Sequence, residues 1–250
     1  MGRLCPTLAA AARLWLCPTL AAAAWLWLCP GLPARAQVDE PRPAGPDCAD
    51  AAVARVQRRY EGMRDLRARF EQTSLAVALG SAGAPAATAS RGRVWFAKPG
   101  RMRWSYEAPE PSLVVSDGET LWVYDPTRAE AHRMPVDEGF LSGTAIQFLL
   151  GQGDLRVAFH VEARRCDPGA WELELRPRQP ATYERLRLRI DAASGDVLET
   201  GIVDLLGNET RVAFSEIEVD AGAGPELFRF DAPEGVRVID LGAPATGSEE

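Results

Sequence analysis

Along most of the chain, apolar and polar residues alternate with the period of two that is typical of β-strands. In the segment 183–190, Leu186, Leu188 and Ile190 alternate with three arginines. Such alternation predicts strands with one apolar and one solvated face, as in an antiparallel sheet. The other segments with strand-like patterns are 66–71, 94–96, 102–106, 113–115, 121–124, 155–163, 171–176, 197–205 and 211–219. About nine or ten strands joined by tight turns predict one strongly curved antiparallel sheet.

Two segments have a helical pattern instead. The first takes Asp47 or Asp50 as its N-cap and ends at Gly62. Its apolar stripe consists of three residues at helical spacing, Val53, Val56 and Tyr60. The second is the apolar run 144–150, whereas residues 80–90 and 125–139 are predicted loops. Two short helices cannot cover the apolar side of so many strands, so either the sheet closes or a cavity remains.

The first thirty-six residues are typical of a secretory signal peptide. A leucine-, alanine- and tryptophan-rich run leads to Ala34 and Ala36, the small residues that a signal peptidase reads, which predicts cleavage after Ala36. A membrane anchor is the alternative, but three prolines break the apolar run and no basic cluster follows it. Leu28 precedes Cys29, so no lipid-attachment signal is present. We expect signal 1–36, a flexible leader 37–47, a domain 48–241 and a disordered tail 242–250.

Composition and charge narrow the function. The chain has 250 residues, 46% of them hydrophobic and 25% charged, values typical of a globular protein. Its net charge of −7 argues against nucleic-acid binding, which needs a basic face. Cleavage of the signal leaves two cysteines, Cys48 and Cys166, in an oxidising compartment where one disulfide can form. The sequence leaves open whether they pair or remain free thiols.

Residues suited to catalysis are few. Beyond the predicted signal there are two histidines, His132 in a predicted loop and His160 in a predicted strand. The chain has no zinc-protease, serine-hydrolase, CxxC or phosphate-loop motif, so we expect neither an enzyme nor a bound metal. Asp117 is interpreted as a turn residue. The arginine ladder, Arg185, Arg187 and Arg189, is interpreted as a solvated strand face, the alternative being a docking surface for an acidic partner or a lipid headgroup.

Four further motifs carry a family resemblance. Residues 94–104 (VWFAKPGRMRW) and 113–126 (LVVSDGETLWVYDP) are similar to strand–turn–strand signatures of the periplasmic outer-membrane lipoprotein carriers of the LolA type. Residues 66–72 (LRARFEQ) resemble the first strand of that family, and 228–236 (FRFDAPEGV) its closing motif. All four occur in the family order behind a signal peptide, and together they span nearly the whole predicted domain.

The resemblance implies a fold and a function. The fold is mainly β with short helices (α+β), a single curved antiparallel sheet forming an incomplete β-barrel with a helical lid over an apolar cavity. The function is periplasmic transport without a cofactor, by a monomer that binds no nucleic acid. Acylated lipoproteins are received from an inner-membrane ABC-type releasing complex and delivered to an outer-membrane receptor. A lipoprotein-sensing regulatory protein of the same fold is one alternative, and a periplasmic hydrolase is another.

Strand parity and the resemblance together predict the site. The expected acyl-cavity residues are Phe70, Val94, Phe96, Met102, Trp104, Tyr106, Val114, Ile146, Phe148 and Leu149. For these residues the alternative is plain core packing. At the position before the Pro-Gly turn the family usually carries an arginine that bonds lid carbonyls and holds the cavity shut. Here that residue is Lys98, which we expect to bond near Leu149 and Leu150 as a gate; a solvated turn residue is the alternative.

Overall fold

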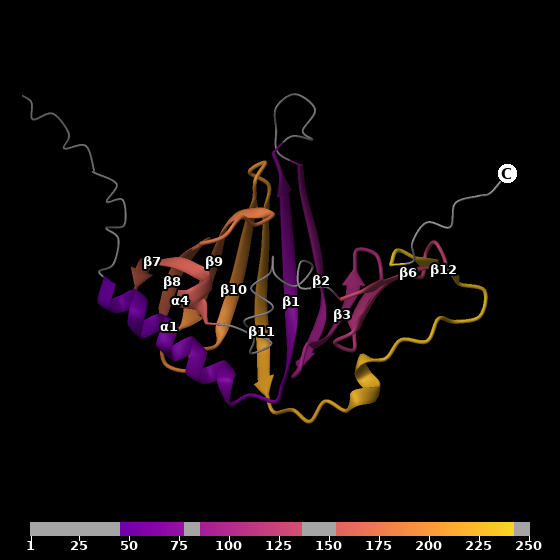
Figure 1. Ribbon diagram of the computed structural model, residues 1–250, viewed down its shortest axis with the longest axis horizontal. Coiled ribbons are helices and arrows are strands. Elements are labelled where there is room, and N and C mark those ends of the chain that lie inside the picture. Colours follow the sequence, from indigo (N-terminus) through magenta and orange to yellow (C-terminus); the bar gives the residue numbers. More distant parts are fainter. Residues whose placement is uncertain (1–45, 78–85, 137–153, 243–250) are drawn as a thin grey trace, which may run out of the picture. The chain divides into compact units, whose positions relative to one another are not determined.

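The structure is a computed structural model, and it describes residues 46–77, 86–136 and 154–242. These residues belong to one compact unit, Asp39–Glu250. Its elements are shown in Figure 1 and are, in chain order, α1 Pro46–Glu61, β1 Asp65–Ala76, β2 Ala86–Ala97, β3 Arg101–Ala108, β4 Ser112–Ser116, β5 Thr120–Asp125, β6 Glu130–Pro135, α4 Leu155–Ala158, β7 Phe159–Cys166, β8 Ala170–Pro177, β9 Tyr183–Asp191, β10 Val197–Asp204, β11 Glu209–Val219, the 3₁₀ helix η2 Pro225–Phe228 and β12 Arg237–Asp240. The mainly β fold predicted from the alternation is confirmed.

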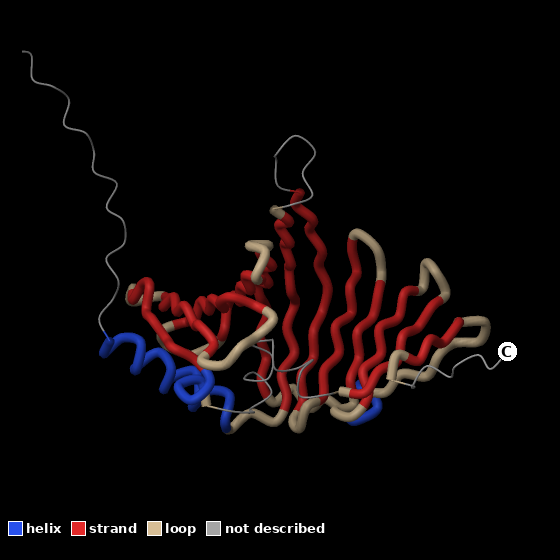
Figure 2. Tube along the Cα trace, turned by 45° about the horizontal axis from the view of Figure 1, so that its top comes forward, coloured by secondary structure: helices blue, strands red, loops and turns tan. Residues whose placement is uncertain are grey.

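The described strands all belong to a single sheet. Their order is β12-β6-β5-β4-β3-β2-β1-β11-β10-β9-β8-β7, and each pair is antiparallel except β12, which runs parallel to β6. The edge strands β7 and β12 do not pair with each other, so the sheet stays open (Figure 2). The expectation of an unclosed antiparallel sheet is therefore confirmed.

One face of the sheet, here called the inner face, is apolar across nearly its whole width. Cross-strand register places Phe96 between Leu66 and Met102, and on the other side of β1 it places Phe214 beside Phe70. The helix α1 packs against β7 and β8 and buries Val53, Val56 and Tyr60 in the same core. The opposite, outer face carries most of the charged residues of the strands.

The boundaries of α1 differ slightly from the prediction. The helix starts at Pro46, so both candidate N-cap aspartates, Asp47 and Asp50, lie inside it, and it begins within the stretch expected to be a flexible leader. Proline is common at the first position of a helix, because its missing N–H would have no partner there. Among the described residues, no helix is long and apolar enough to span a membrane.

Several elements correct the prediction. The segment 125–139 was expected to be a loop, but it contains β6, a strand that places His132 between β5 and β12. The predicted strand 155–163 instead opens with the short helix α4, which Asp154 caps by accepting a hydrogen bond from the Arg156 N–H at 2.7 Å. The strand β2 begins inside the predicted loop 80–90. The helix predicted at 144–150 lies outside the described residues.

The end of the described chain covers part of the outer face. Residues 225–240, here called the C-terminal strap, comprise η2, an irregular segment and β12. Phe228 is only 1% exposed, and the ring of Phe230 lies 5.3 Å from Trp122 and 5.2 Å from Tyr124. The aromatic residues of the closing FRFDAPEGV motif therefore anchor the strap to the outside of the sheet.

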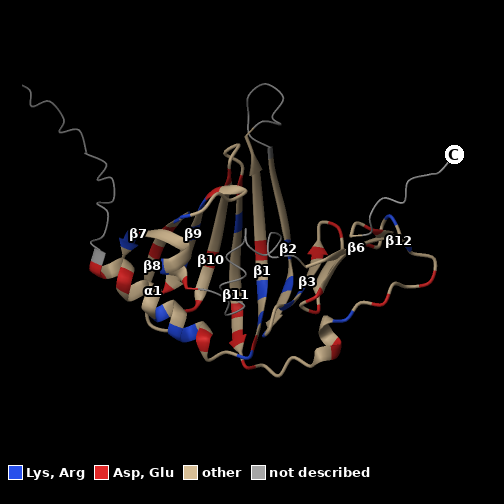
Figure 3. Ribbon diagram, in the orientation of Figure 1, with Lys and Arg blue, Asp and Glu red and all other residues tan. Residues whose placement is uncertain are grey.

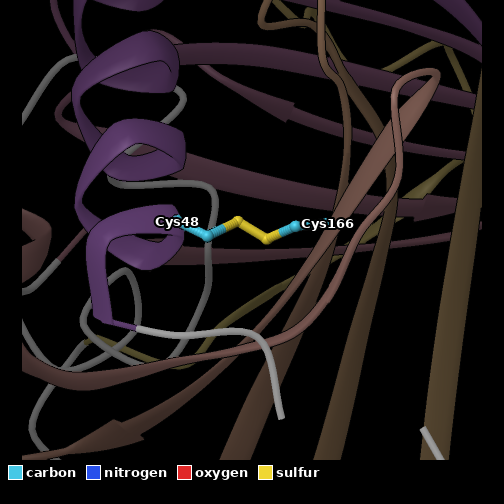
Figure 4. Close-up of a disulfide and its surroundings, with 2 residues drawn as sticks. All are labelled: Cys48 and Cys166. Atoms are coloured by element: carbon cyan, nitrogen blue, oxygen red, sulfur yellow. A yellow bond between two sulfur atoms is a disulfide. The ribbon is translucent and has the colours of Figure 1, made fainter. Parts of the chain in front are cut away.

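A disulfide joins the first turn of α1 to the end of β7. The sequence left the pairing of Cys48 and Cys166 open, and the structure links their sulfur atoms, with Cα atoms 6.5 Å apart (Figure 4). That separation lies within the range found for protein disulfides. The start of α1 is thus covalently tied to an edge strand 118 residues further along the chain.

Candidate functional site

An aromatic cluster occupies the middle of the inner face. The ring of Phe70 on β1 meets Trp104 at 4.8 Å and Tyr106 at 5.0 Å, both in edge-to-face geometry. The rings of Phe96 and Phe214 also lie near Trp104, with centroids 5.7 Å and 6.2 Å away. Edge-to-face pairs are favourable beyond simple burial because the positive ring edge meets a negative ring face.

The seven predicted cavity residues that the structure describes all lie on this face. They differ in depth. Phe70, Val94, Phe96, Met102 and Trp104 are buried, with Trp104 the most exposed at 7%. Tyr106 and Val114 are only half-buried and pack against the core. Ile146, Phe148, Leu149 and Leu150 lie outside the described residues, so their predicted roles in the cavity, lid and gate remain predictions.

A small apolar cleft lies between α1 and the sheet. Its volume is about 230 Å³ when the space open to solvent is included. The lining residues come from α1, β1, β2, β10 and β11 and are Tyr60, Leu66, Ala68, Phe96, Val197, Phe214 and Ile217. Of these only Phe96 was predicted as a site residue. Phe214 and Ile217 are three residues apart in β11, so strict alternation would put them on opposite faces. The irregularity in the β1–β11 register, beside Glu216 with its φ of +51°, brings both to the cleft.

Lys98 bonds the last turn of α1. Its Nζ donates to the carbonyl oxygens of Tyr60 at 2.5 Å and Glu61 at 3.0 Å. The last carbonyls of a helix have no partner within it and carry partial negative charge, so an ammonium group is well suited to cap them. Lys98 is therefore not a solvated turn residue: it holds a helix of the inner face. The predicted contact with Leu149 and Leu150 falls outside the described residues.

The turn that carries Lys98 is supported by the second signature motif. Gly118, with φ of +103°, lies against the Pro99-Gly100 turn, and a Cβ there would be 3.1 Å from the carbonyl oxygen of Pro99. Asp117 Oδ1 accepts hydrogen bonds from the N–H groups of Glu119 at 2.9 Å and Thr120 at 2.8 Å. Asp117 is a turn residue, and the SDG turn packs against the turn that positions Lys98.

Further contacts hold α1 along its length. Arg59 forms an ion pair with Asp196 at 2.6 Å, and the Arg55 guanidinium donates to the carbonyl oxygen of Ala193 at 2.5 Å. The Tyr60 hydroxyl accepts a hydrogen bond from the Val197 N–H at 3.0 Å. Burial raises the pKa of Tyr60 to about 12, although the bond from Val197 opposes the shift. In this state α1 is docked at its start, its middle and its end.

The outer face is rich in charged residues across the described strands. Figure 3 colours the charged residues along the strands. A hollow of about 620 Å³ over β7 to β11 is lined mainly by arginine and glutamate. In the arginine ladder, Arg187 pairs with Glu209 at 2.9 Å and Arg185 with Glu184 at 2.5 Å. These ion pairs fit the interpretation of the ladder as a solvated strand face.

The histidines do not form a reactive site within the described part of the chain. His132 is half-buried in β6, and His160 is exposed in β7, where its Nε2 lies 3.3 Å from the Arg178 guanidinium. Across the described ranges, no three His, Cys, Asp or Glu side chains are grouped so that they could hold a metal ion.

Comparison with known proteins agrees with the arrangement. The family model of the outer membrane lipoprotein carrier protein LolA matches residues 61–231. An outer-membrane lipoprotein carrier protein of Alkalilimnicola ehrlichii is 32% identical over 206 residues, covering 80% of this chain and 90% of that protein. One of Nitrosospira multiformis is 33% identical over 180 residues, covering 72% and 84%. The crystal structure of a LolA superfamily protein from Nitrosomonas europaea aligns with a TM-score of 0.40 at 13% identity, covering 73% of this chain and 97% of that one. The chain belongs to the LolA family of outer membrane lipoprotein carrier proteins.

Proposed function

We propose that this protein carries acylated lipoproteins across the periplasm and shields their acyl chains against the inner face of the sheet. It is exported, cleaved after Ala36 and acts as a monomer without a cofactor. It receives cargo from an inner-membrane ABC-type releasing complex and delivers it to an outer-membrane receptor. The observation that carries the proposal is the inner face itself, apolar across an open sheet and half-buried at Tyr106 and Val114.

The physical need for such a face is large. Burying an acyl chain is worth about 0.8 kcal/mol per CH₂, so a chain of roughly a dozen methylenes costs about 10 kcal/mol to expose to water. A lipoprotein therefore needs a protein surface that takes its chains while it leaves the membrane. The carrier must also release them, which favours adaptable apolar contacts such as those of Met102 and the aromatic cluster over directional bonds.

The docked position of α1 corresponds to a closed carrier. Even when the space open to solvent is included, the cleft beneath α1 comes to only about 230 Å³, below the roughly 300–1,000 Å³ typical of ligand pockets. Cargo would therefore need α1 to move, and the bonds from Lys98 to Tyr60 and Glu61 would have to break. Lysine offers a point charge where the family usually has the planar fork of arginine, so we expect this contact to hold α1 more weakly.

The test of the proposed function compares two faces of one strand. Val114 and Leu113 are neighbours on β4, both half-buried, but only Val114 lies on the inner face. Because Val114 is only half-buried, a carboxylate at this position can reach solvent while it lies in the path of acyl chains. We expect Val114→Glu to keep its fold and to weaken binding of a fluorescent acyl probe at least tenfold, whereas Leu113→Glu binds the probe as the wild type does.

A third variant changes a deeply buried residue of the inner face, Met102, which is 3% exposed. Met102→Glu buries a charge in the core, so we expect it to lower the free energy of unfolding by several kcal/mol. Thermal melting and probe titration are measured on the same samples. A wild type that binds no acyl probe, or a Val114→Glu variant that binds it with wild-type affinity, would contradict the proposed function.

A further inference from the structure

Two residues at the turn between β2 and β3 contact elements on opposite faces of the sheet. Lys98 at the start of this turn reaches α1 on the inner side. Arg101, the first residue of β3, has the opposite strand parity from Met102 and lies on the outer side, where it meets the C-terminal strap. In Figure 1 the yellow segment after β11 runs along the lower end of the sheet, the end at which α1 also terminates.

Arg101 contacts both the strap and the residue that caps α1. Its guanidinium donates from Nη2 to the carbonyl oxygen of Lys98 at 2.7 Å. Its Cζ also lies 5.4 Å from the centre of the Phe228 ring, the buried anchor of η2. A guanidinium over an aromatic face is attracted by the negative charge of the ring. A chain of direct contacts therefore runs from Phe228 through Arg101 and Lys98 to the last turn of α1.

The position of Arg101 leaves one of its hydrogen-bond donors without a partner among the described residues. Its Nε is buried and has no hydrogen-bond partner within the described part of the chain. Buried donors without a partner are rare in proteins, because such a group loses its bond to water. A free arginine side chain would turn that N–H toward solvent. The ring of Phe228 and the carbonyl of Lys98 hold the guanidinium in place instead.

We propose that Arg101 is a positioning residue for Lys98, and that through it the seating of η2, the first part of the C-terminal strap, on the outer face stabilises the docked position of α1 on the inner face. Arg101 fixes the backbone of Lys98 so that the ammonium group points at the carbonyls of Tyr60 and Glu61. When η2 leaves the outer face, Arg101 loses its ring contact and the cap on α1 weakens. The consequence for cargo rests on the proposed function, in which release of α1 opens the carrier.

The coupling is tested by amide hydrogen exchange in the last turn of α1, relative to exchange in β9 of the same sample, which removes the effect of global unfolding. Lys98→Leu removes the cap and should raise this relative exchange about tenfold, as expected for loss of a bond to a charged group. Arg101→Leu should raise it several-fold. The double variant Lys98→Leu/Arg101→Leu should exchange no faster than Lys98→Leu alone, because Arg101 acts through Lys98.

Two variants distinguish the effect of Arg101 on Lys98 from a general loosening of the strap. Arg101→Lys keeps a donor and a cation and should retain most of the protection. Arg133→Leu removes another arginine of the outer face, one that lies 5.8 Å from the Trp122 ring and pairs with Asp240 of β12. It should leave exchange in α1 unchanged.

Additive effects of the two leucine substitutions, unchanged exchange in Arg101→Leu, or an equal rise in Arg133→Leu would each overturn the proposal. The measurement needs no cargo. A wild type that fails to bind an acyl probe would therefore refute the proposed function while leaving the coupling between Arg101 and α1 to be judged by exchange alone.

Discussion

At the scale of single residues, Gly92 explains how the aromatic cluster fits on the inner face. It lies buried on β2, between Phe70 of β1 and Tyr106 of β3, next to an irregularity in the β2–β3 register. A Cβ at this position would overlap the carbonyl oxygen of Ser105 and lie 3.0 Å from the Phe70 ring. The cluster can lean over β2 only because this position has no side chain.

We therefore expect Gly92→Ala to destabilise the fold. Overpacking of a tight site costs about 1–3 kcal/mol, and here the obstacle is backbone, which cannot rotate away. Gly169→Ala is the matched control, since a Cβ there meets nothing within 4 Å, and it should change the free energy of unfolding by less than about 0.5 kcal/mol. Urea denaturation of both variants checks this. Equal midpoints for Gly92→Ala and the wild type would contradict the prediction and would mean that β2 can move away from the Ser105 carbonyl without loss of stability.

For the site residues that the structure describes, the sequence predicted the face of the sheet but not the depth of burial. Parity alone places Met102 and Val114 on one side, because successive side chains of a strand point to opposite faces. Depth depends on partners distant in the chain, such as Phe214, which lies beside Phe70 only because β11 pairs with β1. The acceptors of Lys98 could not be predicted either, since they are backbone carbonyls and carry no signal of their own.

At the scale of elements, the local sequence pattern was sufficient to predict some strands but not others. The strand β9 was predicted almost to its ends because its leucines and arginines alternate strictly. The strand β6 (EAHRMP) has only Ala131 fully buried, and it is a strand because β5 and β12 pair with it on either side. The strand β12 joins β6 from more than a hundred residues away, a pairing that no local pattern reveals.

The attachment of α1 through Cys48 and Cys166 predicts a redox-dependent stability. On the chain-entropy model, a disulfide that closes a loop of this length stabilises the fold by up to about 4–5 kcal/mol. We expect the double variant Cys48→Ala/Cys166→Ala to lose much of that free energy of unfolding in urea. The wild type in a reducing agent should unfold at the same urea concentration as the variant. The variant itself is the control for the reducing agent, because without the two cysteines its midpoint should not change. A wild type whose midpoint ignores the reducing agent would contradict the prediction.

At the scale of the whole molecule, the described charges favour stability at neutral pH. The clearest case is Glu174, whose side chain is 6% exposed and bonds Arg164 and Arg176, both at 2.8 Å. Burial alone would raise the pKa of this carboxyl, but the bond from Arg164 and the nearby arginine charges outweigh it, so the pKa lies below its usual value. Hydrogen bonds likewise lower the pKa of Asp191, where Ser194 donates, and of Asp220, where Arg64 donates.

The direction of these shifts sets the pH dependence. A carboxyl whose pKa is lower in the folded protein contributes stability above its unfolded pKa, and that stability is lost as the pH falls through the folded pKa. We therefore expect the free energy of unfolding to be constant near neutral pH and to fall below about pH 4.5, the ordinary value for glutamate. Chemical denaturation between pH 7 and pH 3 measures this curve.

Glu174→Gln isolates the contribution of one buried carboxylate. At pH 7 the variant should be less stable by about 1–3 kcal/mol, the worth of hydrogen bonds to a charged group. The difference should narrow as the pH falls below about 4.5, because the wild type then protonates Glu174 and loses the same interactions. Glu218→Gln is the control: its carboxylate is about half exposed and pairs with Arg67 at the surface, where an ion pair is worth at most about 1 kcal/mol. A gap between the wild type and Glu174→Gln that stays constant from pH 7 to pH 3 would show that packing, and not the charge of Glu174, stabilises this part of the outer face.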